Sequence, residues 1–391
     1  MVRLNPFEGT SNRTSVIILQ KGRKTKYPMR SYLYWKKTIK KKSIPLDATL
    51  DDVLKMTQRK QFIAEPVDKN DITSPWITGR PKALKAIRKI LGQSDYTAHA
   101  GVYTGGANAV YWVEIVDKKP DGLVIISNIT EGAKREVERV QTAIESDLLY
   151  PLLRGRDVKK WKAEPTAYII MAQDPVKRRG IDESDMKTKH PKTYIYLKRF
   201  EKTLRERAAF KRYFTRKDKK SGRITETGPF YSMFDVGNYA FAPYKVVWTR
   251  VANIEAAVVS EKDGKSIIPQ ETITLVALNN EQEAHYLCAM INSSPFQYAC
   301  LSYSQAGGKS MGSPHVLENI RIPKFDSRNP PHVELAELSE KAHLIANVDD
   351  KDTLQNLEEE IDTVSAQIWG LTDDELKEIK TSLEELTVKI L

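Results

Sequence analysis

Gly308-Lys309-Ser310 has the residue types that end a phosphate-binding loop, so it is a natural place to look for chemistry in this chain. The full pattern needs another glycine five residues before Gly308, and Tyr303 stands there. The run also follows a helix-like stretch and not a strand. We therefore expect no nucleotide-binding loop. A flexible loop that lays backbone N–H groups and Lys309 on a phosphate of DNA stays open.

Metal and thiol chemistry have little support in the sequence. The six histidines are scattered, and no His-Glu-x-x-His pattern occurs. Cys288 and Cys300 form no Cys-x-x-Cys pair, so we expect neither a zinc site nor a disulfide framework. Two cysteines fit a reducing cytoplasm. No apolar run approaches the ~18 residues of a membrane span, so we expect a cytoplasmic protein that does not act with a membrane.

The stretch Lys198–Arg223 is strongly basic, with 12 Lys or Arg against three acidic residues, a net charge of +9. Helical spacing predicts that Leu204 faces a core. Lys198, Lys202 and Arg205 would then share another face and could meet successive phosphates. The other interpretation is a helix whose cations face water. The charge excess and nearby tyrosines favour nucleic acid, though phosphate contacts position a protein and do not read bases.

A second basic stretch, Leu148–Trp161, joins an apolar half to several cations. In a structural interpretation the cations line a turn around Gly155. In a functional one, Arg154 and Arg156 place their guanidinium forks on phosphate or guanine. The residues alone do not decide between the two.

Two polar loops are candidates for reading base edges. Asn108, at the end of the Gly-rich stretch Thr104–Asn108, could hydrogen-bond a base. The same stretch is equally well explained as a tight turn before the next strand. Ser310, Ser313 and His315 form the second loop.

The charge is unevenly distributed along the chain. The net charge is +11, but residues 349–391 hold 13 acidic and 4 basic residues, a net of −9. The first 348 residues therefore carry about +20. A basic body with a small acidic tail indicates a polyanionic partner. A lysine-rich surface kept for solubility or heat tolerance is the other explanation.

The elements that must position these residues follow from the apolar periodicity. Strands are predicted from runs rich in Val, Ile and aromatic residues, and helices from apolar residues spaced by three and four. Gly370 should end a helix, with Thr372 and Glu375 forming a capping box for the next. Strands are expected at 15–20, 27–35, 111–116, 123–127, 168–172, 245–250, 254–260, 274–277 and 320–323, and helices at 46–62, 82–91, 134–144, 281–291 and from 331 onward.

Several stretches, in their order, together resemble one family. They are NPFEGTSNRTSVIILQKG with YPMRSYLYW, AGVYTGGANAVYWVEIV, IESDLLYPLLRGRDVKKW, HPKTYIYLKRFEKTLRERAAF, FYSMFDVGNYAFAPYKVVWTR, HYLCAMINSSPFQYACLSYS, GGKSMGSPHVLENIRIP and EEEIDTVSAQIWGLTDDEL. This sequence is similar to the C-terminal half of adenine-specific DNA methyltransferases of type II restriction–modification systems, including forms in which methylation and cleavage are fused. The resemblance covers nearly the whole chain.

The resemblance implies a division of labour. In that family a catalytic domain binds S-adenosylmethionine and methylates an adenine that has been flipped out of the helix. Its signatures are a Gly-rich turn and an Asn-Pro-Pro-aromatic tetrapeptide, and a second domain recognises the DNA target. Asn5-Pro6-Phe7 departs from the tetrapeptide, since it has one proline and no preceding strand, and no Gly-rich turn lies upstream. The expectation is therefore a chain without its own cofactor site, inactive alone, whose missing half would use S-adenosylmethionine.

The expected fold class is α+β: an N-terminal β-hairpin left from a methyltransferase sheet (1–40), a helical linker (41–94), a mixed α/β target-recognition domain (95–325) and a C-terminal helical element (326–391). The expected partner is double-stranded DNA, with a separate methyltransferase catalytic chain as a further one. The alternatives are a subunit of a split adenine methyltransferase and a degenerate remnant without activity. The candidate DNA-binding residues are Asn108, Arg154, Arg156, Lys198, Lys202, Arg205, Arg212, Lys309, Ser310 and His315.

Overall fold

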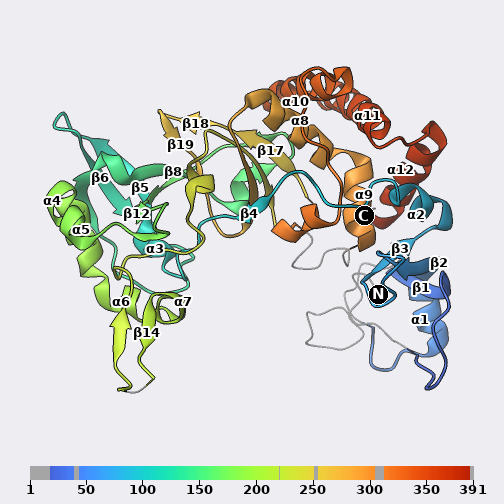
Figure 1. Cartoon of the computed structure of the whole chain (residues 1–391), viewed down its shortest axis with the longest axis horizontal. Helices are drawn as coiled ribbons and strands as arrows, with labels where there is room; N and C mark the ends of the chain where they lie inside the picture. Colours follow the sequence, from blue (N-terminus) through green and yellow to red (C-terminus); the bar gives the residue numbers. More distant parts are fainter. Residues whose placement is uncertain (1–17, 39–43, 220, 251–253, 304–311, 388–391) are drawn as a thin grey trace.

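The computed structural model describes residues 18–38, 44–219, 221–250, 254–303 and 312–387, and Figure 1 shows them as two lobes. One lobe is built on a six-stranded sheet, and the other on a four-stranded sheet covered by helices. The predicted α+β class is confirmed. Within these ranges, no helix has the length and apolar character needed to cross a membrane.

The sheet lobe, whose core is made of residues from Val102 to Ala240 together with Ile268, has the strand order β20-β8-β11-β5-β6-β7. Its strands are rich in Val, Ile and Leu, and their inward side chains meet the short helices of the lobe in one core. The strands are β5 (Trp112–Lys118), β6 (Leu123–Asn128), β7 (Gln141–Glu145), β8 (Leu149–Leu153), β11 (Ala167–Ile170) and β20 (Ile268–Pro269). The helices are α3 (Asn108–Tyr111), α4 (Glu183–Lys189), α5 (Pro191–Arg199), α6 (Glu201–Arg205) and α7 (Ala208–Tyr213).

The helical lobe has the strand order β17-β16-β21-β4, with α8, α9 and the C-terminal helices in one continuous core. Its sheet is made of β4 (Ala98–Ala100), β16 (Tyr244–Thr249), β17 (Ala256–Val259) and β21 (Ile273–Leu278). The helices are α2 (Pro81–Ile87), α8 (Glu281–Asn292), α9 (Ser294–Tyr303), α10 (Pro330–Val348), α11 (Lys351–Ile368) and α12 (Asp373–Thr387). β4 comes before residues 102–240 in the sequence, and β16, β17 and β21 come after them. The chain therefore leaves the core of the helical lobe after β4 and returns to it at β16.

The N-terminal part adds a three-stranded antiparallel sheet of order β1-β2-β3 to the helical lobe. Its elements are β1 (Met29–Lys37), α1 (Leu50–Met56), β2 (Thr57–Pro66) and β3 (Trp76–Gly79). Two-residue strands complete the pairs β9 (Val158–Lys159) with β10 (Lys162–Ala163), β12 (Gln173–Asp174) with β13 (Arg179–Gly180), and β18 (Glu261–Lys262) with β19 (Lys265–Ser266).

The acidic tail lies against the basic N-terminal part of the chain. Lys89 pairs with Glu375 at 2.7 Å, and Lys60 pairs with Glu385 at 2.9 Å. Arg80 lies 3.5 Å from Glu378. Earlier in the tail, Glu358 pairs with Lys160 at 2.7 Å. The charge asymmetry in the sequence is therefore partly an internal one, since the negative tail faces cations of its own chain.

The predicted end of the first tail helix is confirmed. Gly370 lies two residues after Ile368, the last residue of α11, and adopts a φ of +66°, a conformation that favours glycine after a helix. The capping box of the next helix is also present: the Thr372 backbone N–H donates to the Glu375 carboxylate at 2.9 Å, and the Glu375 N–H donates to the Thr372 hydroxyl at 3.3 Å.

Two N-terminal expectations differ from the structure in secondary structure. The helix expected at 46–62 is limited to α1, after which β2 runs from Thr57. The N-terminal hairpin is expected to pair residues 15–20 with 27–35. In the structure β1 pairs with β2 instead, and residues 18–20 form no strand. Residues 15–17 lie outside the described residues. The hypotheses for domain boundaries stay predictions.

The expected helix at 134–144 is wrong, and Asn128 supplies the physical reason. Its side-chain oxygen accepts from the Val140 N–H at 2.7 Å, and its amide donates to the Glu138 carbonyl at 3.0 Å. These bonds use backbone groups that a helix would need, so residues 134–140 form no helix and lead into β7.

Candidate nucleic-acid interface

Arg207 lies between α6 and α7 and is fully buried. Its guanidinium donates to the carbonyls of Leu204 at 2.8 Å, Thr104 at 2.7 Å, Phe230 at 2.7 Å and Ser232 at 2.9 Å. Four carbonyl acceptors satisfy most of the five donors that the side chain offers. One cation of the basic stretch is therefore structural, and it fixes the loop at Thr104 against the start of α7.

The loop Thr104–Asn108 is a tight turn that packs on α7. Gly105 and Gly106 have φ of +72° and +83°, which favours glycine at both positions. A Cβ on Gly105 would lie 3.2 Å from the Arg207 Cδ and 3.1 Å from the Phe234 ring. The Asn108 Oδ1 accepts a hydrogen bond from the Thr104 hydroxyl. The glycines bend the chain as the turn interpretation expects, but helix α3 and not a strand follows the bend. Base contact by Asn108 stays a prediction.

Two of the candidate cations are held by carboxylates of the same lobe. Lys198 Nζ lies 2.6 Å from a Glu201 oxygen, and the hydrogen bond to Glu201 raises the pKa of this lysine. Arg205 Nη2 lies 2.7 Å from the other Glu201 oxygen, and Arg205 also pairs with Glu226. A phosphate would have to compete with these internal partners. Lys198 and Arg205 are therefore weaker candidates than the sequence indicated.

Seven further described cations of the stretch face solvent. Among the described residues, no carboxylate pairs with the exposed side chains of Lys202, Lys211, Arg212, Arg216, Lys217, Lys219 and Arg223. We call these seven residues the basic segment. Tyr213 and Ile224 lie beside them and are 57% and 64% exposed. Unpaired cations with exposed rings and aliphatic side chains between them are what phosphates and bases require.

The arginines of the second basic stretch separate in the structure. Arg154 is buried, with its Nε 3.4 Å from an Asp157 carboxylate oxygen and its Nη2 donating to the Thr166 hydroxyl. Arg156 is 72% exposed at its side chain and lies 3.9 Å from Asp157. Arg154 therefore stabilises the turn, and Arg156 is the one that solvent or a ligand can reach.

The second polar loop is only partly described. Lys309 and Ser310 lie outside the described residues. Where the description resumes, the Gly312 carbonyl accepts from Trp248 Nε1 at 3.0 Å and from the Thr274 hydroxyl at 2.6 Å, which anchors the loop on the four-stranded sheet. His315 is exposed, and its Nδ1 lies 2.8 Å from a Glu318 carboxylate oxygen. A DNA contact by His315 stays a prediction.

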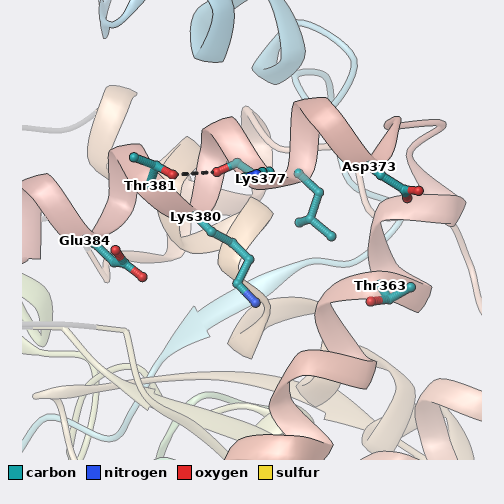
Figure 2. Close-up of a pocket in the computed structure, with 7 residues that line it drawn as sticks. Thr363, Asp373, Lys377, Lys380, Thr381 and Glu384 are labelled. Atoms are coloured by element: carbon teal, nitrogen blue, oxygen red, sulfur yellow. Dashed lines mark hydrogen bonds between the residues drawn. The ribbon is translucent and has the colours of Figure 1, made fainter.

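A hollow on the tail helices is a second place where a ligand could bind. The hollow is lined by Thr363 of α11 and by Asp373, Lys380, Thr381 and Glu384 of α12, among others. Figure 2 shows that the side chains of these residues point in different directions. The Thr381 hydroxyl donates to the carbonyl of Lys377 at 2.9 Å. Lys380 Nζ lies 3.4 Å from an Asp362 oxygen. Because these polar groups do not converge and several are already paired, the hollow is the weaker candidate.

The described ranges offer no cluster for a metal ion and no reactive cysteine. Within them, no three His, Cys, Asp or Glu side chains are placed to hold a metal ion. Burial raises the pKa of the thiols of both Cys288 and Cys300, so neither is a reactive thiolate.

Lys245 on β16 is fully buried, and burial lowers its pKa to about 7. Its ammonium group donates to the carbonyl of Ala242.

Comparison with known proteins finds similarity to parts of two of them. Over 153 residues, 39% of the chain, the sequence is 28% identical to the type II methyltransferase M.NspV of Nostoc sp.. This match spans 28% of that relative's length. A solved structure of the type IIL restriction–modification enzyme MmeI in complex with DNA superposes with a TM-score of 0.43 and 8% identity, over 84% of this chain and 40% of that one. No protein-family model matches the chain.

Proposed function

We propose that this chain is the DNA-recognition part of an adenine-specific methyltransferase of a restriction–modification system. The sequence relationship to a type II methyltransferase supports the class of enzyme. Double-stranded DNA is the partner, and the sheet lobe carries the surface that binds it. In this proposal methyl transfer depends on a separate catalytic chain that holds S-adenosylmethionine.

The basic segment is the observation that carries this proposal. Among the described residues, seven exposed, unpaired cations fall from Lys202 to Arg223, whereas the candidate cations Lys198, Arg205 and Arg154 are held by Glu201, Glu226 and Asp157. An unpaired cation that binds a phosphate releases counterions from DNA, which increases the binding affinity. A cation already held by a carboxylate must first break that ion pair. The segment is therefore where phosphates would be bound.

Duplex DNA binding across salt concentrations tests the proposal. Fluorescence anisotropy should show an affinity that falls linearly with log salt, with a slope of about −0.9 for each phosphate contacted. The variant Lys202→Ala/Lys211→Ala/Arg212→Ala should reduce the slope by about 2–3 and weaken binding by at least tenfold at low salt.

The matched control removes the same charge type elsewhere in the same lobe. Lys177, Lys187 and Lys189 pair with Asp182, Glu183 and Asp185. Their triple alanine variant should bind DNA within about twofold of the wild type, because these cations are already neutralised. Absence of binding by the wild type at low salt, or an equal loss in the control, would overturn the proposal.

A further inference from the structure

The two strands β14 (Thr215–Lys217) and β15 (Ile224–Glu226) form a ribbon that leaves the sheet lobe next to α7. Its register pairs Thr215 with Glu226, Arg216 with Thr225, and Lys217 with Ile224. Figure 1 shows the ribbon extending away from the rest of the lobe. Beyond Thr215, every described residue of the ribbon is exposed. Within the described part of the chain, only the base of the ribbon packs against another element.

The base of the ribbon is firmly attached. The Thr215 hydroxyl donates to the Lys211 carbonyl of α7 at 2.6 Å, and the Thr227 N–H donates to the Phe214 carbonyl at 2.9 Å. Glu226 pairs with Arg205 of α6. Three contacts of different kinds thus set the direction in which the ribbon leaves α6 and α7.

Hydrogen bonds join the described residues on the two sides of the ribbon's tip. The Asp218 carboxylate accepts from the Ser221 N–H at 2.6 Å and from the Ser221 hydroxyl at 2.9 Å. The Asp218 N–H donates to the Arg223 carbonyl at 2.8 Å, and Gly222 has a φ of +70°. An isolated two-stranded hairpin is at best marginally stable in water. The Asp218 carboxylate therefore stabilises the turn, and the Glu226 carboxylate stabilises the base.

The exposed side chains of the ribbon combine charge with one aliphatic group. Arg216, Lys217, Lys219 and Arg223 are exposed cations. Ile224 is 64% exposed and stands directly across from Lys217. Side chains directly across an antiparallel pair lie on the same face. A β-branched apolar side chain beside a lysine, on an element exposed along its length, indicates contact with a ligand that has both anionic and apolar groups.

We propose that the β14–β15 ribbon enters the major groove of DNA, with its cations on phosphates and base edges and Ile224 against the 5-methyl group of a thymine. The inference rests on the proposed function for the choice of DNA. A two-stranded ribbon with its side chains fits the major groove of B-DNA, which is about 12 Å wide, and not the minor groove of about 6 Å. The deep, narrow major groove of A-form RNA excludes it.

The contact between Ile224 and a thymine methyl group is tested by removing the methyl group from the DNA and, separately, the isoleucine side chain from the protein. Duplexes are first selected from a random pool by the wild-type chain, and each thymine is then replaced by uracil, which removes only the 5-methyl group. At the contacted position we expect wild-type binding to fall about threefold to fivefold, the value of one buried methyl group. Ile224→Ala should lose a similar factor on thymine DNA and show no further loss on uracil DNA.

Ile195 provides the matched control. It is 60% exposed on α5 of the same lobe and is not part of the ribbon. Ile195→Ala should bind as the wild type does and keep its sensitivity to uracil. Protection of guanine N7 from methylation, a major-groove readout, should appear with the wild type and be lost with Arg216→Ala/Arg223→Ala.

The outcomes separate this inference from the proposed function. If the wild type binds no duplex DNA, the proposed function itself fails. If it binds but neither responds to uracil nor protects guanine N7, the ribbon does not enter the major groove, and only this inference fails. Equal affinity for double-stranded RNA of the same sequence would also overturn it.

Discussion

Arg207 shows how much one side chain can hold together in the sheet lobe. Its guanidinium joins the Thr104 loop, α6 and the segment Phe230–Ser232 through carbonyls alone. It also lies 5.8 Å or less from the ring centres of Tyr111, Phe210 and Phe234. In the sequence it is indistinguishable from the other cations around it, because nothing local marks it as buried.

Replacing Arg207 should therefore unfold or greatly weaken the lobe. Arg207→Leu leaves four buried carbonyls without a donor, and we expect a loss of about 3–5 kcal/mol in the free energy of unfolding. Urea denaturation followed by tryptophan fluorescence measures it. Arg199→Leu, on the exposed side of α5, is the control and should change stability by less than about 1 kcal/mol. Similar losses in both variants would contradict a structural role for Arg207.

At the scale of elements, His343 joins α10 to β17. Its Nδ1 donates to the Ser339 carbonyl at 2.7 Å, and its Nε2 accepts from the Val258 N–H at 2.9 Å. This arrangement requires the neutral ring, since a protonated Nε2 could not accept. His285 on α8 packs edge-on against it at 4.9 Å. Burial lowers the pKa of His343, and burial together with the neighbouring His343 lowers the pKa of His285 to about 3.

Stability should therefore fall as the solution is acidified. In the unfolded chain both rings bind protons below about pH 6.5, whereas the folded state keeps them neutral, so the unfolded state takes up more protons. We expect the free energy of unfolding to decrease from pH 6.5 towards pH 4, measured by urea denaturation at several pH values. His285→Leu should reduce the slope in this range. An unchanged slope in that variant would show that His285 is not kept neutral by the fold.

For the molecule as a whole, the tail carboxylates compete with any polyanion for the N-terminal cations. Glu375, Glu378 and Glu385 pair with Lys89, Arg80 and Lys60. Such partly exposed pairs each contribute about 0–1 kcal/mol to stability. Their larger effect is on the electrostatic potential around the protein, because each carboxylate neutralises a cation that could otherwise bind an anionic ligand.

Neutralising these carboxylates should increase non-specific DNA binding. Glu375→Gln/Glu378→Gln/Glu385→Gln frees three cations, and we expect a steeper salt dependence of affinity for random duplex DNA with little change in melting temperature. Anisotropy titrations at several salt concentrations measure the slope. Asp374→Asn/Glu359→Gln/Glu360→Gln changes exposed tail carboxylates and is the control, which should affect the slope less. Equal slopes in the two variants would mean that the three ion pairs do not hide their cations.

Local sequence accounts for the features that depend on neighbours along the chain. The α+β class, the strands around residues 123–127 and 245–250, the helix at 281–291 and the capping box at Thr372 all follow from local periodicity and local hydrogen bonds. The charge asymmetry and the position of the basic stretch are properties of composition, and they are enough to indicate a polyanionic partner.

Which cations are available to such a partner depends on tertiary packing. The pairs Lys198–Glu201 and Arg154–Asp157 join residues only three apart, so the sequence already contains them. Arg205 and Arg207 look equivalent to Lys202 and Arg212 in the sequence, but folding brings Glu226 to Arg205 and backbone carbonyls to Arg207. The same holds for the segment held by Asn128 and for the exposed ribbon beside α7. Sequence patterns could not predict these outcomes, because burial and pairing are set by which segments pack together and not by the order of residues.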